Sequence, residues 1–330
     1  MNKVFLTELS IAGEPIVGKL DPMGLNNRTV ESWILAMDCP NLPIWNVIKE
    51  DTTYDMIAYV VIPKGIEQSK YLVSEHPDLM QNLKSKFSKV YVIQEGEIGY
   101  YSHRSVTEQV WWYSQLYYCD RLYVHNEYDT KYFKGLFPDL DIRVIRTMMS
   151  TSALDENKFL PKEERAIICG PMTFDYLGFH QAIIAQELGC PIDIPPMGRD
   201  RMPKDSYDMA AASGVNYLEY NIWTDWMYNL SKYKYAYMMS LGTAAGSFAL
   251  NCGYLGIPCI GNIHQNTQRL CFPDLSVEAH DLKKAKELAK NLRNNEEFYV
   301  NCSEKAKMLY EKHFSESSYI EQWKRIKQSI

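Results

Sequence analysis

Short apolar runs alternate with segments of helical periodicity over nearly the whole chain. The runs of the first half cover 3–9, 43–49, 54–62, 89–94, 121–125 and 142–147, and those of the second half cover 165–170, 190–194, 215–220, 235–239 and 258–261. Between them, apolar residues recur at helical spacing, as in SVTEQVWWYSQLYY, LGFHQAIIAQEL and the segments that follow Asp281. Strands that alternate with helices predict mainly parallel sheets with helices on both faces.

A polar segment, MMSTSALDENKFLPKEE, interrupts this alternation after Thr147 and predicts an interdomain linker. We therefore expect two Rossmann-like, doubly wound domains, one over 1–150 and one, with the linker, over 151–314. The last segment, 315–330, carries Trp323 among apolar residues at helical spacing, so we expect it to pack back on the first domain. Ligands of open α/β sheets bind at the carboxyl ends of the strands, which predicts a site in a cleft between the sheets.

Composition narrows the class of protein. A length of 330 residues suits two domains of about 150 residues each. The formal charge of −6 argues against a protein that coats nucleic acid by bulk charge. No apolar run approaches the roughly 20 residues of a membrane span, and the first residues, MNKVFLTELSIAGEP, lack the apolar core of a signal peptide. Eight scattered cysteines without a CxxC pair predict reduced thiols and a cytoplasmic location.

The segment Ser240–Asn262, SLGTAAGSFALNCGYLGIPCIGN, carries the clearest chemical signal. A strand runs into a turn of small residues, and a helix and a second strand follow. Such a turn lets backbone N–H groups and a helix N-terminus approach an anion closely. The turn residues that we expect to bind a phosphate group are Gly242, Thr243, Gly246 and Ser247.

This segment resembles the donor-binding domain of the GT-B fold glycosyltransferases, in the group of glycosyltransferase families 1 and 4. SFALNCGYLGIPCIG is similar to that group's Gly/Ser turn, helix and "GxPVI" strand, and CDRLYVHNEYDTKYFKGLFPDLDIRVI is similar to part of its acceptor domain. The resemblance implies two α/β domains that face each other across a cleft. It also implies that the second domain binds a nucleotide sugar and that the first binds the acceptor.

The chain departs from the pattern of this group at the donor site. Many retaining members carry two Glu residues separated by seven positions, and the corresponding positions here are Thr243 and Asn251. These side chains can still form hydrogen bonds with hydroxyls, but without the strength that the charge of a carboxylate adds. The group's basic pair is also missing, because CGPMTFDYLG contains no Arg or Lys.

The candidates to replace the missing basic pair are three cations of the loop PPMGRDRMPKD: Arg199, Arg201 and Lys204. A guanidinium group binds diphosphate oxygens bidentately, and this loop follows a predicted strand. Arg269 is a further candidate, and the sequence places it near Gln265 and Gln268 in the loop after GIPCIGN.

The first predicted strand is followed by GEPIVGK, which matches the start of a nucleotide-binding P-loop. Leu20 stands where that motif requires Ser or Thr, so we do not expect a triphosphatase. In the resembled fold, glycines at this position approach the donor phosphate or sugar, which makes Gly13 and Gly18 candidate donor-binding residues.

Candidate acid/base residues follow the predicted strand 89–94. Glu95, Glu97 and His103 lie in QEGEIGYYSHRS, where an inverting enzyme would hold the base that deprotonates the acceptor hydroxyl. We favour Glu97 over His103 because it lies close to the end of the strand. Two further candidates are His76 and His125, the latter beside Glu127.

These observations predict a hexosyl- or pentosyltransferase that needs no metal and no cofactor beyond the nucleotide-sugar substrate. Backbone amides and cations would stabilise the nucleoside diphosphate that leaves. The acceptor can be a glycan, a lipid-linked intermediate, a small molecule or a modified base in DNA, and both retention and inversion stay open. Two alternatives are a nucleotide-sugar epimerase of the same fold and a non-catalytic module that binds a sugar or nucleotide.

Overall fold

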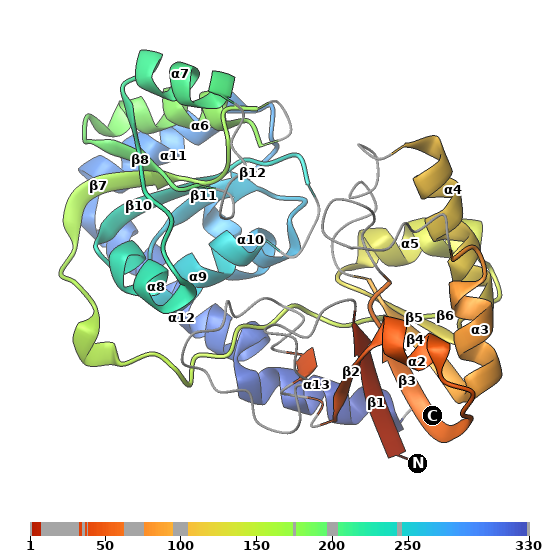
Figure 1. Ribbon diagram of the computed structural model, residues 1–330. Coiled ribbons are helices and arrows are strands. Elements are labelled where there is room, and N and C mark those ends of the chain that lie inside the picture. Colours follow the sequence, from red (N-terminus) through yellow and green to blue (C-terminus); the bar gives the residue numbers. More distant parts are fainter. Residues whose placement is uncertain are drawn as a thin grey trace. The chain divides into compact units, whose positions relative to one another are not determined.

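The computed structural model describes residues 2–7, 33–34, 37, 39–62, 76–94, 105–173, 176–196, 204–242 and 246–328. These residues form two compact units, each with a six-stranded parallel sheet of its own (Figure 1). Unit 1 extends to Thr147 and takes up the chain again at Ile320, whereas unit 2 comprises Met148–Tyr319. The two parallel α/β sheets confirm the fold class predicted from the alternation of strands and helices.

The sheet of unit 1 has the strand order β2-β1-β3-β4-β5-β6. Its strands are β1 (Asn2–Thr7), β2 (Asn41–Pro43), β3 (Tyr54–Val60), β4 (Phe87–Ile93), β5 (Arg121–Val124) and β6 (Asp141–Val144). Val4 pairs with Ala58, and Val92 pairs with Leu122, so the longest apolar runs lie side by side in the centre. Strands buried on both faces need such continuous apolar runs, which is why the sequence pattern located them.

Helices cover both faces of this sheet. One face packs against α2 (Ile44–Lys49), α3 (Leu79–Lys86), α4 (Val106–Gln115) and α5 (Glu127–Leu136), and its core includes Val90 and Val92. The other face carries Tyr59 and Tyr123, which contact Trp323 of α13 (Glu316–Gln328) at ring distances of 5.2 and 5.6 Å. Gln322 adds a hydrogen bond to Arg146 N–H at 3.4 Å. The last helix therefore contributes to the core of unit 1.

The strand predicted over 43–49 is wrong, because Ile44–Lys49 forms α2. Ile44, Trp45 and Val47 are buried on one side of this helix. A short run of apolar residues cannot by itself distinguish a buried strand from a short helix. Pro43 occupies the N-cap position with an extended backbone, and this geometry starts the helix there.

The sheet of unit 2 has the order β12-β11-β10-β7-β8-β9. Its strands are β7 (Glu163–Ile168), β8 (Ile192–Ile194), β9 (Val215–Tyr217), β10 (Tyr233–Met238), β11 (Cys259–Asn262) and β12 (Ser276–Val277). The order reverses between β7 and β10, the two central strands. Such a reversal is where an open α/β sheet separates its loops and leaves room for a ligand.

The helices of unit 2 follow the strands in alternation. They are α6 (Gly178–Ala185), α7 (Lys204–Ala212), α8 (Trp223–Ser231), α9 (Ser247–Leu255), α10 (Asn266–Cys271), α11 (Leu282–Asn294) and α12 (Glu296–Phe314). Two short elements, α10 and β12, have no counterpart in the sequence prediction. Six and two residues are too few to show a recognisable period.

All eight cysteines are free thiols, and seven of them are buried. No helix within the described parts of the chain combines the length and the apolar composition that crossing a membrane requires.

Candidate functional site

The carboxyl ends of β10 and β11 lie next to each other and carry a connected set of polar groups. The Asn262 side chain donates to Ser240 O at 2.9 Å and accepts from His264 N–H at 3.1 Å. Ser240 Oγ accepts a hydrogen bond from Gly242 N–H at 3.1 Å. These bonds link the described residues after β10 to those at the end of β11.

The N-terminus of α9 opens at the same edge. Its N-cap residue, Gly246, has a left-handed backbone with φ of 60°, and no side chain caps the helix. A Cβ atom at Gly246 would lie 2.3 Å from Thr267 Oγ1, which itself donates to Gly246 O at 3.0 Å. Only glycine fits this close approach. The first-turn N–H groups and the helix dipole favour a negatively charged ligand here, and Ser247 adds an exposed hydroxyl.

Three further polar side chains surround this helix end or the loop beside it. Gln265 is 2% exposed, its Oε1 has no hydrogen-bond partner within the described ranges, and this atom lies 3.2 Å from the Cβ position of Gly246. His264 Nε2 lies 2.8 Å from Glu278 Oε2, and these residues follow β11 and β12. Arg269 donates to Asn266 Oδ1 at 3.3 Å. The described residues of this edge therefore offer acceptors, donors and the cation Arg269.

The loop after β7 has a different chemistry. The carboxamide of Gln181 accepts from Cys169 N–H at 3.1 Å and donates to Tyr176 O at 2.6 Å, while Ser206 Oγ accepts from Met172 N–H at 2.7 Å. Burial raises the pKa of the Cys169 thiol, which therefore stays protonated and unreactive. Side chains from α6 and α7 thus fix this loop, and cations for a diphosphate must come from elsewhere.

Asn251 lies in α9 and is 7% exposed. With its oxygen facing α8, its amide accepts from Trp226 Nε1 at 3.0 Å and donates to Ser247 O at 3.1 Å. This geometry ties α9 to α8. The expected contact between Asn251 and a sugar hydroxyl stays a prediction. Gln268 is also buried, and it donates to Cys259 O at 2.8 Å.

The structure therefore brings Gly242, Gly246, Ser247, Gln265 and Arg269 to one edge of unit 2. Lys204 begins α7. The other predicted site residues lie outside the described residues and stay predictions: Gly13, Gly18, Glu95, Glu97, His103, Arg199, Arg201 and Thr243. Sequence reasoning missed the pair His264 and Glu278, which stand fourteen positions apart. No sequence signal marked this pair, because Glu278 follows β12, a two-residue strand that the sequence pattern did not predict.

In unit 1, the carboxyl edge of the sheet also gathers polar side chains. Thr7 Oγ1 donates to Asn41 Oδ1 at 3.1 Å. His125 is 1% exposed and stacks on Trp33 with ring centroids 5.3 Å apart, and His76 packs against Trp45 at 4.8 Å. His76 and His125, two of the three histidines proposed as bases, are thus in contact with aromatic rings. Gln94, which ends the ladder of β4, was not singled out from the sequence.

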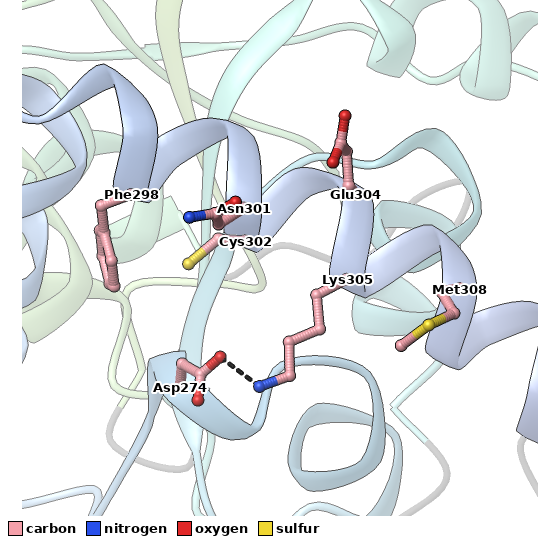
Figure 2. A pocket seen from close by; sticks show the side chains of 7 residues that line it. All are labelled: Asp274, Phe298, Asn301, Cys302, Glu304, Lys305 and Met308. Carbon is pink, nitrogen blue, oxygen red and sulfur yellow. Dashed lines mark hydrogen bonds and ion pairs between the residues drawn. The ribbon is translucent and has the colours of Figure 1, made fainter.

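A depression of about 610 Å³ on the surface of unit 2 is a different feature. Its lining comes from α12 and the 3-10 helix Pro273–Leu275, and an ion pair of 2.6 Å joins Lys305 to Asp274 across it (Figure 2). Pro273–Leu275 precedes β12, so this depression lies toward the amino end of that strand, away from the polar edge. Among the described residues, no three Asp, Glu, His or Cys side chains gather as a metal site would require.

Comparison with known proteins shows which solved structures this architecture is similar to. No protein-family model and no curated protein matches the sequence. Solved structures do match: the pneumococcal O-GlcNAc transferase GtfA, solved with UDP and GlcNAc, is 13% identical over 86% of this chain, with a TM-score of 0.61. An α-glucosyltransferase solved with UDP-glucose and DNA is 12% identical over 98% of this chain and 98% of that one, with a TM-score of 0.63. Sucrose-phosphate synthase from Thermosynechococcus elongatus is 10% identical over 100% of this chain and 99% of its own, also at 0.63.

The extent of these matches differs. The chain spans 59% of the length of GtfA but nearly the full length of the other two enzymes. At these low identities the matches show a common fold, which in this chain is a pair of parallel α/β units. The chain has the fold of the GT-B glycosyltransferases.

Proposed function

We propose that the protein is a glycosyltransferase that moves a hexosyl or pentosyl group from a nucleotide sugar to an acceptor hydroxyl. The uncapped N-terminus of α9 at the carboxyl edge of unit 2 carries this proposal. Gly246 keeps this helix end open, and Ser247 and Gln265 add polar groups beside it. A diphosphate is the ligand whose charge such a helix end stabilises. In this proposal unit 2 binds the donor and unit 1 binds the acceptor.

The reaction follows from the chemistry of the donor. The acceptor oxygen attacks the anomeric carbon, the bond to the diphosphate breaks, and the acceptor proton passes to a base. In an inverting enzyme this base is Glu97, with Glu95 and His103 as alternatives, whereas in a retaining enzyme the leaving phosphate takes the proton. In this proposal the leaving group is stabilised without a metal ion, by N–H groups of α9 and by the cations Arg199, Arg201, Lys204 and Arg269.

The proposal extends to the acceptor and to the location of the protein. Glycans, lipid-linked intermediates, small molecules and modified bases in DNA are the acceptor classes to test. The α-glucosyltransferase that was solved with DNA supports including the last class, because it matches over 98% of both chains. We place the protein in the cytoplasm, since its eight cysteines are free thiols.

Calorimetry with UDP, GDP, ADP and dTDP, with and without EDTA, tests the donor site. We expect one of these nucleotides to bind with the same affinity in EDTA. Arg199→Ala and Arg201→Ala should each weaken binding by about 10- to 150-fold, the equivalent of one charged hydrogen bond at roughly 1.5–3 kcal/mol. Lys305→Ala, in the depression on α12, is the matched control and should bind as the wild type does.

Binding of none of the four nucleotides would contradict the proposal. Transfer itself is measured as release of free nucleoside diphosphate from the nucleotide sugar that binds, with each acceptor class in turn. Release together with an altered sugar, in the absence of any acceptor, would point to the epimerase instead. Binding without release in any mixture would indicate the non-catalytic module.

A further inference from the structure

Gln94 combines deep burial with an unsatisfied carboxamide. It directly follows β4 at the carboxyl edge of the unit 1 sheet, and its backbone N–H donates to Tyr123 O at 2.9 Å, which continues the ladder. Its side chain is 2% exposed, yet neither Oε1 nor Nε2 has a hydrogen-bond partner in the described parts of the chain. Desolvation of a carboxamide without compensation destabilises the folded state.

Two other buried glutamines, Gln115 and Gln181, show how this fold satisfies both ends of such a group. Gln115 accepts from Met80 N–H at 3.0 Å and donates to Pro77 O at 2.9 Å. Gln181 likewise bonds through both ends of its amide, to Cys169 and Tyr176. Among the described residues, Gln94 is the carboxamide whose oxygen and nitrogen are both buried without a partner. An unsatisfied buried polar group in a native protein calls for an explanation, and a functional role is one of them.

The position of Gln94 indicates what it can bind. Side chains alternate along a strand, so Gln94 shares the face of Val90 and Val92, whose side chains are in the apolar core beneath it. The carboxyl edge above is where ligands of open α/β sheets bind. A carboxamide offers one acceptor and two donors, a combination that matches hydroxyl groups, which both donate and accept. Neither a phosphate nor an apolar group would satisfy both ends.

We propose that Gln94 is a specificity-determining residue that binds hydroxyl groups of a carbohydrate substrate through both ends of its amide. The inference rests on the proposed glycosyl transfer for the identity of its ligand. It assigns to unit 1 a substrate contact that does not depend on charge. The hydroxyls belong either to the acceptor or to the transferred sugar, and kinetics separates these two sources.

The test replaces Gln94 by the apolar isostere in Gln94→Met and by the carboxyl isostere in Gln94→Glu. Gln94→Met removes an unsatisfied group, so the unfolding midpoint of unit 1 should stay or rise by about 2–4 °C. Its kcat/KM should fall about 10- to 100-fold, since the substrate loses its partner. A rise in the KM of the acceptor alone places the hydroxyls on the acceptor, and a rise in that of the donor alone places them on the donor.

Gln94→Glu adds a pH signature that a purely structural role would not produce. Burial raises the pKa of a carboxyl group, and its protonated form keeps both a donor and an acceptor. The activity of Gln94→Glu relative to wild type should therefore increase as the pH is lowered. Gln115→Met is the matched control, and its unfolding midpoint should fall, because Met80 N–H and Pro77 O lose their partners.

The outcomes separate this inference from the proposed function. An inactive wild-type protein with every donor and acceptor would refute the proposed function. If the wild type is active, two results would overturn the role of Gln94. One is that Gln94→Met is as active as the wild type, and the other is that Gln94→Met is less stable than Gln115→Met.

Discussion

At the scale of single residues, Gly246 is where backbone geometry and the candidate donor site coincide. We expect Gly246→Ala to destabilise unit 2 by at least about 1–2 kcal/mol, because a side chain costs that much in the left-handed conformation, and its Cβ would also meet Thr267 Oγ1. Gly135→Ala is the control. Gly135 lies in α5, and an added Cβ would meet no atom within 4 Å beyond its chain neighbours and the backbone of its own helix, so the substitution should stabilise unit 1 by about 0.5–1 kcal/mol. Urea denaturation measures both, and a Gly246→Ala protein as stable as the wild type would contradict this account of the turn.

At the scale of elements, Asp120 joins α3 to β4. Its carboxylate accepts from Lys84 Nζ at 2.5 Å and from Val90 N–H at 2.8 Å, and Lys89 lies at 3.6 Å. Partial burial opposes ionisation, but the hydrogen bonds and the charges of the two lysines outweigh it, so the pKa of Asp120 lies below its usual value. A lowered pKa stabilises the fold above the unfolded value of about 3.9, and this contribution is lost as the pH falls through the folded pKa.

Asp120→Asn should therefore lower the stability of unit 1 by roughly 1 kcal/mol near neutral pH, since the site is partly exposed to solvent. Below about pH 4 the difference from wild type should shrink as the wild-type carboxylate becomes protonated. Thermal unfolding of both proteins between pH 3 and pH 8 measures this difference in stability. A difference that stays constant over this whole range would show that the charge of Asp120 contributes nothing.

At the scale of the whole molecule, each unit has a hydrophobic core of its own, and the last helix joins the core of unit 1. Calorimetry should therefore resolve two unfolding transitions. Trp323→Ala removes a side chain that is 2% exposed, and it should destabilise unit 1 by about 3–5 kcal/mol while the transition of unit 2 stays in place. Tyr310→Ala, buried in unit 2, should lower the other transition instead. A single transition that both variants shift equally would show that the units unfold together.

The elements that the sequence predicted correctly are those with strong local patterns. The apolar run around Val92 needed no tertiary information, because a strand buried on both faces is apolar throughout. The Gly/Ser turn before Ser247 was recognisable because its small residues precede a helix. The segment 43–49, by contrast, is too short to show a recognisable period. It forms a helix from Ile44 on, with Pro43 as the N-cap in an extended conformation.

The sequence by itself determined two α/β units and the location of a glycine-rich helix start, because both follow from residues close together in the chain. It did not determine which polar groups meet at the edges of the sheets. Three such contacts join residues from separate elements: Asn251 with Trp226, Gln265 with Gly246, and His264 with Glu278. The unsatisfied carboxamide of Gln94 is likewise visible only once its surroundings are known. Hydrogen bonds and burial depend on distances in space, and only the tertiary structure sets these distances.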